Sequence, residues 1–157
     1  METIEHLRRL FIYNAWANRQ VLTALKTNRN EKAKKILTHL LITEKEYFER
    51  LYDKDSTDFD FWQDLSFEEC ERLMQENAEN YTRILAKRDD KNLEQIAKYK
   101  TSEGVSHENT WRQLLTHVLF HSATHRGNIV IVLREQGFTP PKVDYIIFLR
   151  EIYLTGN

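Results

Sequence analysis

Three of the six histidines in this chain, His117, His121 and His125, follow one another at four-residue intervals. On an α-helix four residues make slightly more than one turn, so these side chains would form a ridge along one face. Zinc enzymes use two histidines four residues apart on a helix to supply two imidazole ligands. The spacing therefore predicts a metal site whose third ligand comes from another segment, for which His39 is the candidate. The alternative is that the histidines fill a seam between helices and bind nothing.

The spacing alone does not select the metal-binding pair, because His117 with His121 and His121 with His125 are equivalent. Catalytic zinc sites typically have three protein ligands and one open position. Three neutral imidazoles would leave the ion its full positive charge, which lowers the pKa of a water or thiol placed on it. Two reaction types follow, in which either hydroxide or thiolate attacks an electrophile. The sequence shows no Ser–His–Asp set, P-loop or dinucleotide fingerprint that would favour other chemistry.

Long helices are expected to position these residues. Only four glycines and two prolines occur in 157 residues, which favours uninterrupted helices over a turn-rich β fold. Capping residues Ser66 and Thr110 open two of the helices, Gly137 ends the last long one, and Gly127 is expected to let two helices approach closely. Asp144 is expected to cap a short final helix over 145–153. The fold prediction is an all-α four-helix bundle with a short extra C-terminal helix. The long helices are predicted over 3–26, 31–52, 66–86 and 110–136.

Two of the connections between the predicted helices have distinctive sequences. The acidic loop 53–64 contains Phe59, Phe61 and Trp62, whose rings are expected to dock onto the helices. The tract around Tyr99 to Val105 is predicted to form a short hairpin.

The bulk composition predicts a single domain over residues 1–157. Lys and Arg total 23 against 24 Asp and Glu, so there is no basic surplus and nucleic acid is not an expected partner. The single cysteine, Cys70, cannot form an internal disulfide and fits a reducing compartment. There is neither a basic-then-apolar leader nor a long apolar run. The predicted location is therefore cytoplasmic, with no membrane partner.

Several polar residues fall on faces that are otherwise apolar. Asn14 and Asn18 lie in the apolar stripe of the first helix and would either satisfy unpaired groups between helices or orient the imidazoles. Glu44 lies on the inward stripe of the second helix. It is expected either to form an ion pair with Arg126 or Arg50 or to act beside the metal.

Four stretches of the chain together resemble the DinB family, in the same order and at similar spacing. They are residues 13–18, 39–44, 121–128 and 133–144. The resemblance covers nearly the whole chain and is specific only in combination. It implies a four-helix bundle with a three-histidine site for a divalent transition metal such as zinc, nickel or iron. It also implies frequent dimerisation, and the family's relatives include thiol-dependent S-transferases and isomerases.

The family pattern, carried over residue by residue, makes His39, His121 and His125 the metal ligands, with His117 one turn away from the ion. Two positions depart from the pattern: Thr124 stands where the family commonly has a histidine, and Asn128 where it commonly has glutamine. Neither position is a proposed ligand, so the departures bear on catalysis more than on metal binding.

The resemblance favours a metal-dependent transferase that activates a low-molecular-weight thiol for attack on a small electrophile. The alternatives are a metal-dependent hydrolase of a small amide or ester and a non-catalytic, stress-induced metal-binding bundle. The family's historical label refers to induction by DNA damage, which describes regulation and not chemistry. The expected partners are the thiol, the electrophile and a second copy of the chain, docked through the aromatic residues of loop 53–64. No catalytic residue beyond the ligands is assigned.

Overall fold

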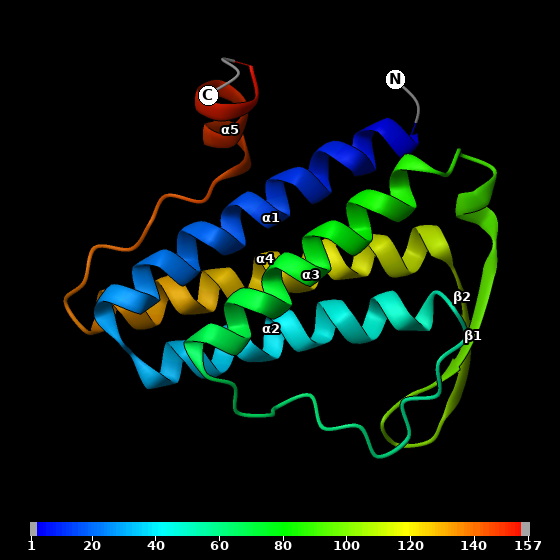
Figure 1. Cartoon of the computed structure of the whole chain (residues 1–157), viewed down its shortest axis with the longest axis horizontal. Helices are drawn as coiled ribbons and strands as arrows, with labels where there is room; N and C mark the ends of the chain where they lie inside the picture. The colour runs from blue at the N-terminus through cyan, green and yellow to red at the C-terminus, as the bar shows by residue number, and fades with distance from the viewer. Residues whose placement is uncertain (1–2, 155–157) are drawn as a thin grey trace.

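A computed structural model describes residues 3–154 (Figure 1). The domain predicted over 1–157 also includes residues 1–2 and 155–157, which lie outside the described part. Within residues 3–154 the chain is mostly helical, and the only sheet has two strands. The long helices are α1 (Thr3–Asn28), α2 (Glu31–Arg50), α3 (Phe67–Ala86) and α4 (Trp111–Glu135). The short elements are η1 (Asn92–Glu94), β1 (Ile96–Lys100), β2 (Ser106–Thr110), α5 (Tyr145–Phe148) and η2 (Leu149–Tyr153).

The four long helices pack so that α1 and α2 each contact both α3 and α4. Figure 1 shows α1 and α3 side by side at the front, with α2 and α4 behind them. The buried apolar residues form two separate clusters along the helices. The cluster nearer the hairpin contains Phe11, Tyr81 and Trp111, and the other contains Leu25 and Leu37 among its members.

A layer of buried polar side chains separates the two apolar clusters. In each long helix, the residues of this layer lie between those that belong to one apolar cluster and those that belong to the other. Its members, called the polar layer below, are Asn14, Asn18, Glu44, Asn77, Ser122 and Arg126. Buried polar groups are costly unless they are hydrogen-bonded. Hydrogen bonds within the layer join its six members, but the side-chain oxygen of Asn77 is buried without a partner.

Local capping sets the starts of α3 and α4 as the sequence predicts. The Ser66 hydroxyl accepts a hydrogen bond from the Glu69 amide at 3.1 Å, and the Glu69 carboxylate accepts one from the Ser66 amide at 2.7 Å. Thr110 and Gln113 form the same reciprocal pair at the start of α4. Gly137 follows α4 with φ +79°, the left-handed conformation that glycine adopts without strain.

The predicted hairpin is present and leads directly into α4. β1 and β2 pair antiparallel with Ile96 opposite Thr110, and Thr110 is both the last residue of β2 and the N-cap of α4. The loop after α2 is joined to the hairpin, because the amide of Ser56 donates to the carbonyl of Lys100 at 3.1 Å. The hairpin therefore positions both the start of α4 and the loop that carries Phe61 and Trp62.

The C-terminal segment differs from the single helix predicted over 145–153. One α-helical turn, α5, is followed by the π-helical turn η2, and Asp144 occupies the N-cap position without a side-chain hydrogen bond. Phe148 is buried and packs on the rings of Tyr13 and Trp16, with centroids 5.7 and 5.5 Å away. Aromatic packing against α1, rather than regular capping, therefore holds this segment.

No helix in the described range 3–154 combines the length and the apolar content needed to cross a bilayer.

Candidate metal centre

The structure brings His39 of α2 together with His121 and His125 of α4. One ring nitrogen from each of the three lies within 4.8 Å of the other two. The ring centroids are 5.1 Å apart for His39 and His121, 4.7 Å for His39 and His125, and 4.4 Å for His121 and His125. This is the only group of three or more histidines, cysteines or carboxylates within residues 3–154 that could hold a metal ion. A carboxylate does not contribute to it.

The loop after α2 fixes the orientation of His39. Its Nδ1 lies 2.9 Å from the carbonyl oxygen of Phe61. A carbonyl can only accept, so Nδ1 carries the proton and Nε2 is the nitrogen left to face an ion. The indole of Trp62 stacks on the imidazole with ring centroids 3.9 Å apart and planes inclined by 6°. The hydrogen bond to the Phe61 carbonyl is typical of metal-ligating histidines, which commonly donate their second ring nitrogen to a carbonyl or carboxylate.

His121 and His125 each bury an unpaired ring nitrogen. In both residues Nδ1 is buried and has no hydrogen-bond partner. Burial, with the nearby His125, His39 and His117, lowers the pKa of His121 from 6.5 to about 3. Burial and His39 also lower the pKa of His125. Both rings are therefore neutral at neutral pH, as ligation requires, and an unpaired buried nitrogen is the kind of group that an ion would satisfy.

The donor set of three imidazoles fits a divalent transition metal and does not fit magnesium or calcium, which prefer oxygen ligands. Histidine nitrogens suit zinc, nickel, iron and copper alike, so the residues do not distinguish between these metals.

His117 does not belong to this group. Its ring lies against Tyr47, with centroids 4.6 Å apart, and 5.7 Å from the ring of His121. Of the two pairs that the spacing leaves open, the structure places His121 and His125 beside His39.

Glu44 is the acceptor at the centre of the polar layer. Its Oε1 accepts hydrogen bonds from Asn14 at 2.7 Å, Asn18 at 2.9 Å and Ser122 at 2.7 Å. Its Oε2 accepts one from Asn77 at 3.3 Å. Arg126 donates to Asn14 and Asn18 instead, and Arg50 donates to Ser56, so both ion pairs considered from the sequence are wrong.

Arg126 reaches the carboxylate of Glu44 through the two asparagines. Its Nη1 donates to the side-chain oxygens of Asn14 at 2.6 Å and Asn18 at 2.8 Å, while the amide groups of the same residues donate to Glu44. Asn14 and Asn18 thus link a buried cation to a buried anion. Ser122 and Arg126 directly follow His121 and His125, so the same hydrogen bonds fix how α4 is rotated beside α2.

Arg50 lies among aromatic rings rather than beside a carboxylate. Its guanidinium lies 4.5 Å from the ring centroid of Tyr47, 4.7 Å from that of Tyr99 and 5.5 Å from that of Phe61. Its Nε donates to the hydroxyl of Ser56 at 3.1 Å. These contacts join α2, the hairpin and the loop that orients His39.

Direct comparison with known proteins now decides the family. The model of the DinB family matches residues 3–152. The chain belongs to the DinB family. It is also similar to "Protein DinB" of Bacillus subtilis (strain 168), with 26% identity over 160 residues that cover 90% of this chain and 92% of the relative. No solved structure matches the chain.

The departures from the DinB pattern leave the three histidines unaffected. Thr124 is exposed on α4, and its hydroxyl donates to the carbonyl of Phe120 at 2.9 Å. Asn128 is also exposed. The contacts of Phe61 and Trp62 with His39 do not follow from the sequence pattern. The aromatic run in loop 53–64 is the only signal for them, and it does not specify a contact.

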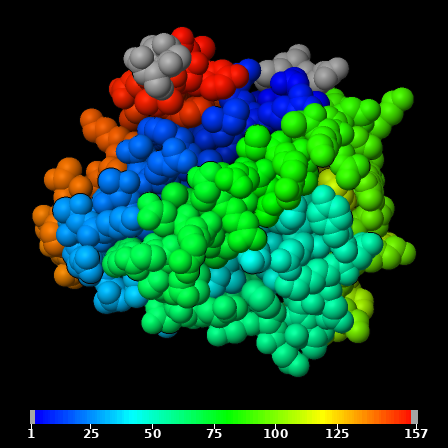
Figure 2. Space-filling model, in the orientation of Figure 1, coloured from blue at the N-terminus to red at the C-terminus, as the bar shows by residue number. Residues whose placement is uncertain are grey.

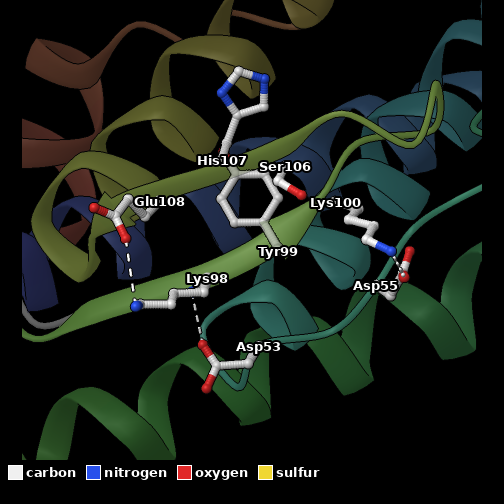
Figure 3. A pocket seen from close by; sticks show the side chains of 8 residues that line it. All are labelled: Asp53, Asp55, Lys98, Tyr99, Lys100, Ser106, His107 and Glu108. Atoms are coloured by element: carbon white, nitrogen blue, oxygen red, sulfur yellow. Dashed lines mark hydrogen bonds and ion pairs between the residues drawn. The ribbon is translucent and has the colours of Figure 1, made fainter.

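A separate cavity of about 520 Å³ lies between the hairpin and the loop after α2 (Figure 3). Its charged side chains pair with one another, for example Lys100 with Asp55 at 3.5 Å and Lys98 with Glu108 at 3.7 Å. None of the three site histidines lines it. This cavity is therefore not part of the candidate metal centre.

Proposed function

We propose that this chain is a divalent-metal-dependent transferase, built on the four-helix bundle of its family, that activates a low-molecular-weight thiol for attack on a small electrophile. The observation that carries the proposal is the convergence of three imidazoles without a carboxylate. A dication held only by neutral ligands would supply the ionisation that a free thiol with a pKa near ~8.5 lacks at neutral pH.

The residues of this chain have distinct roles in the proposal. His39, His121 and His125 would hold the ion. The Phe61 carbonyl keeps the proton of His39 on Nδ1, and Trp62 covers one face of that ring. The polar layer below the histidines fixes the rotation of α4, which keeps the ligands aligned before any ion binds.

Metal analysis followed by a thiol-consumption assay tests the proposal. The purified protein is expected to hold about one transition-metal ion per chain. With that ion present, it should accelerate the loss of cysteine or a related cytoplasmic thiol in the presence of a small alkylating agent. The matched variants are His125→Ala and His117→Ala, which remove the same side chain on the same helix. Only the first should abolish metal content and turnover.

Two results would contradict the proposal. Turnover that continues after the metal has been stripped would exclude metal activation of the thiol. Metal-dependent turnover of an ester or amide without any thiol would instead favour the hydrolase, because the same ion would lower the pKa of a water. A protein that holds metal and turns over neither class of substrate would favour a non-catalytic metal-binding role.

A further inference from the structure

A cavity of about 630 Å³ lies on the side of α4 that faces away from the three histidines. α1, α4 and the segment 139–145 enclose it. Val130 lines this cavity and follows His121 by nine residues, which places the two side chains about half a turn apart around the helix axis. In Figure 1 the segment 136–144 (orange) leaves the end of α4 and passes along α1 to α5, and in Figure 2 it emerges at the edge of the molecule beyond α1.

The cavity is lined by more cations than anions. Arg126, Arg134 and Lys142 contribute positive charge, and Asp144 is the only carboxylate among the lining residues. The side chains of Arg134 and Lys142 have no ion pair or hydrogen bond with any residue in the range 3–154. Two lysine or arginine groups without partners, beside a third cation, favour a ligand that carries negative charge.

Arg126 provides a fixed charge at the inner end of the cavity. It is 2% exposed, and its guanidinium lies 5.4 Å from the ring centroid of Tyr13. The Tyr13 hydroxyl in turn donates to the carbonyl of Val143 at 2.7 Å, which joins α1 to the segment above the cavity. Because Arg126 is held by Asn14 and Asn18, its charge is in place before a ligand arrives.

The remaining walls are apolar and leave room for more than an inorganic ion. They include Tyr13, Val130, Pro140 and Pro141. A Cβ added to Gly127 would meet no heavy atom within 4 Å, so this glycine borders open space and does not mark a close helix contact as expected from the sequence. The volume falls within the range of about 300–1,000 Å³ that is usual for small-molecule sites.

The groove between α1 and α3, of about 770 Å³, has a different charge balance. It contains Arg19, Lys26 and Arg72, but it also contains the carboxylates Glu71, Glu76 and Glu79. The Lys26 ammonium pairs with Glu71 there. Its cations are therefore balanced by carboxylates, and it supplies a control surface on the same molecule.

We propose that the cavity under segment 139–145 binds a small organic anion, with a carboxylate or phosphate head on Arg126, Arg134 and Lys142 and an apolar body against Tyr13 and the two prolines. The site is separate from the metal centre and does not depend on the proposed transferase activity.

Calorimetric titration of the full chain, stripped of metal by a chelating resin, tests this site. The probes are phenyl phosphate and benzoate, which share an aromatic body and differ in the charged head. We expect one molecule to bind per chain, and the tighter probe identifies the preferred head. The double variant Arg134→Gln/Lys142→Gln should weaken binding at least tenfold. The matched control Arg19→Gln/Arg72→Gln removes the same charge from the other groove and should change affinity less than twofold.

Gly127→Leu gives a second test that leaves the charges in place. The new side chain would occupy the open space beside the glycine, so it should weaken binding at least tenfold while the helical circular dichroism stays unchanged. The proposal is overturned if neither probe binds or if the two double variants lose affinity equally, which would indicate a general charge effect. It is also overturned if His121→Ala abolishes binding while Arg134→Gln/Lys142→Gln does not, because the anion would then lie at the histidines.

Discussion

Glu44 gives the sharpest test of how the polar layer supports the site. The carboxylate is 3% exposed and accepts hydrogen bonds from four side chains on the other three long helices. Glu44→Gln keeps the shape and one oxygen but places an amide donor opposite at least one of those four donors. It also leaves the charge of Arg126 without its buried counter-charge. Losing one hydrogen bond to a charged group costs about 1.5–3 kcal/mol of unfolding free energy.

Glu44→Ala should cost more, because it leaves all four donors without their acceptor. Removing one partner from a buried charge network typically costs about 3–5 kcal/mol. A domain of this size has roughly 5–15 kcal/mol of total stability, so the variant should fold but be much weakened. The order of stability is therefore expected to be wild type, then Glu44→Gln, then Glu44→Ala.

Urea unfolding of the metal-free protein, followed by circular dichroism, measures these differences without a contribution from metal binding. Glu49→Gln on the same helix is the matched control. Glu49 is partly exposed and pairs with Lys54, so its loss should cost less than about 1 kcal/mol. If Glu44→Gln costs no more than Glu49→Gln, the hydrogen bonds of Glu44 do not stabilise the fold.

Four further predictions concern the metal, pH, the cysteine and assembly. His121→Ala should abolish metal retention, measured by elemental analysis, whereas His117→Ala should leave it largely intact; the reverse would mean that the wrong pair is assigned. Because burial lowers the pKa of His121 to about 3, against 6.5 when unfolded, the unfolded chain binds more protons between these values. The urea midpoint of the metal-free protein should therefore fall as the pH is lowered from about 6.5 towards 3, and a flat profile would contradict this. Cys70→Ser should leave metal-dependent turnover intact, since burial raises the pKa of this thiol and removes it from solvent; a dead variant would point to a cysteine nucleophile. Light scattering should give the mass of a homodimer, and a monomer mass at working concentrations would count against that expectation.

The sequence predicts the parts of this fold that depend on neighbouring residues. The starts of α3 and α4 follow from Ser66 and Thr110, whose side chains hydrogen-bond only three residues along the chain. The end of α4 follows from Gly137 for the same reason. These helix boundaries can be predicted because they depend only on residues close together in the sequence.

The same sequence does not determine contacts that depend on the rotation of one helix against another. Periodicity places His117, His121 and His125 on one ridge, but the choice of pair depends on how α4 faces α2. That rotation is set by bonds such as the one from Ser122 to Glu44, between residues 78 positions apart. The family resemblance, rather than the spacing, selected the pair that the structure brings beside His39.

Tertiary packing also overrode a local expectation in the C-terminal segment. The final helix was expected to be regular, but the burial of Phe148 against α1 accompanies a change from α- to π-helical turns. The dimer surface expected at the loop aromatics stays a prediction. Phe59 and Phe61 are only partly exposed, and Trp62, although 48% exposed, stacks on His39.

On α4 each candidate metal ligand is followed directly by a residue of the polar layer. This arrangement affects how the sequence can change during evolution. His121 precedes Ser122 and His125 precedes Arg126, so any rotation that moves a ligand also breaks a buried hydrogen bond. Directional bonds therefore help the apolar packing to hold the angle of α4. Apolar cores accept exchanges between side chains of similar volume at modest cost. The two apolar clusters of this protein can therefore diverge in sequence while the spacing of the three imidazoles is inherited unchanged.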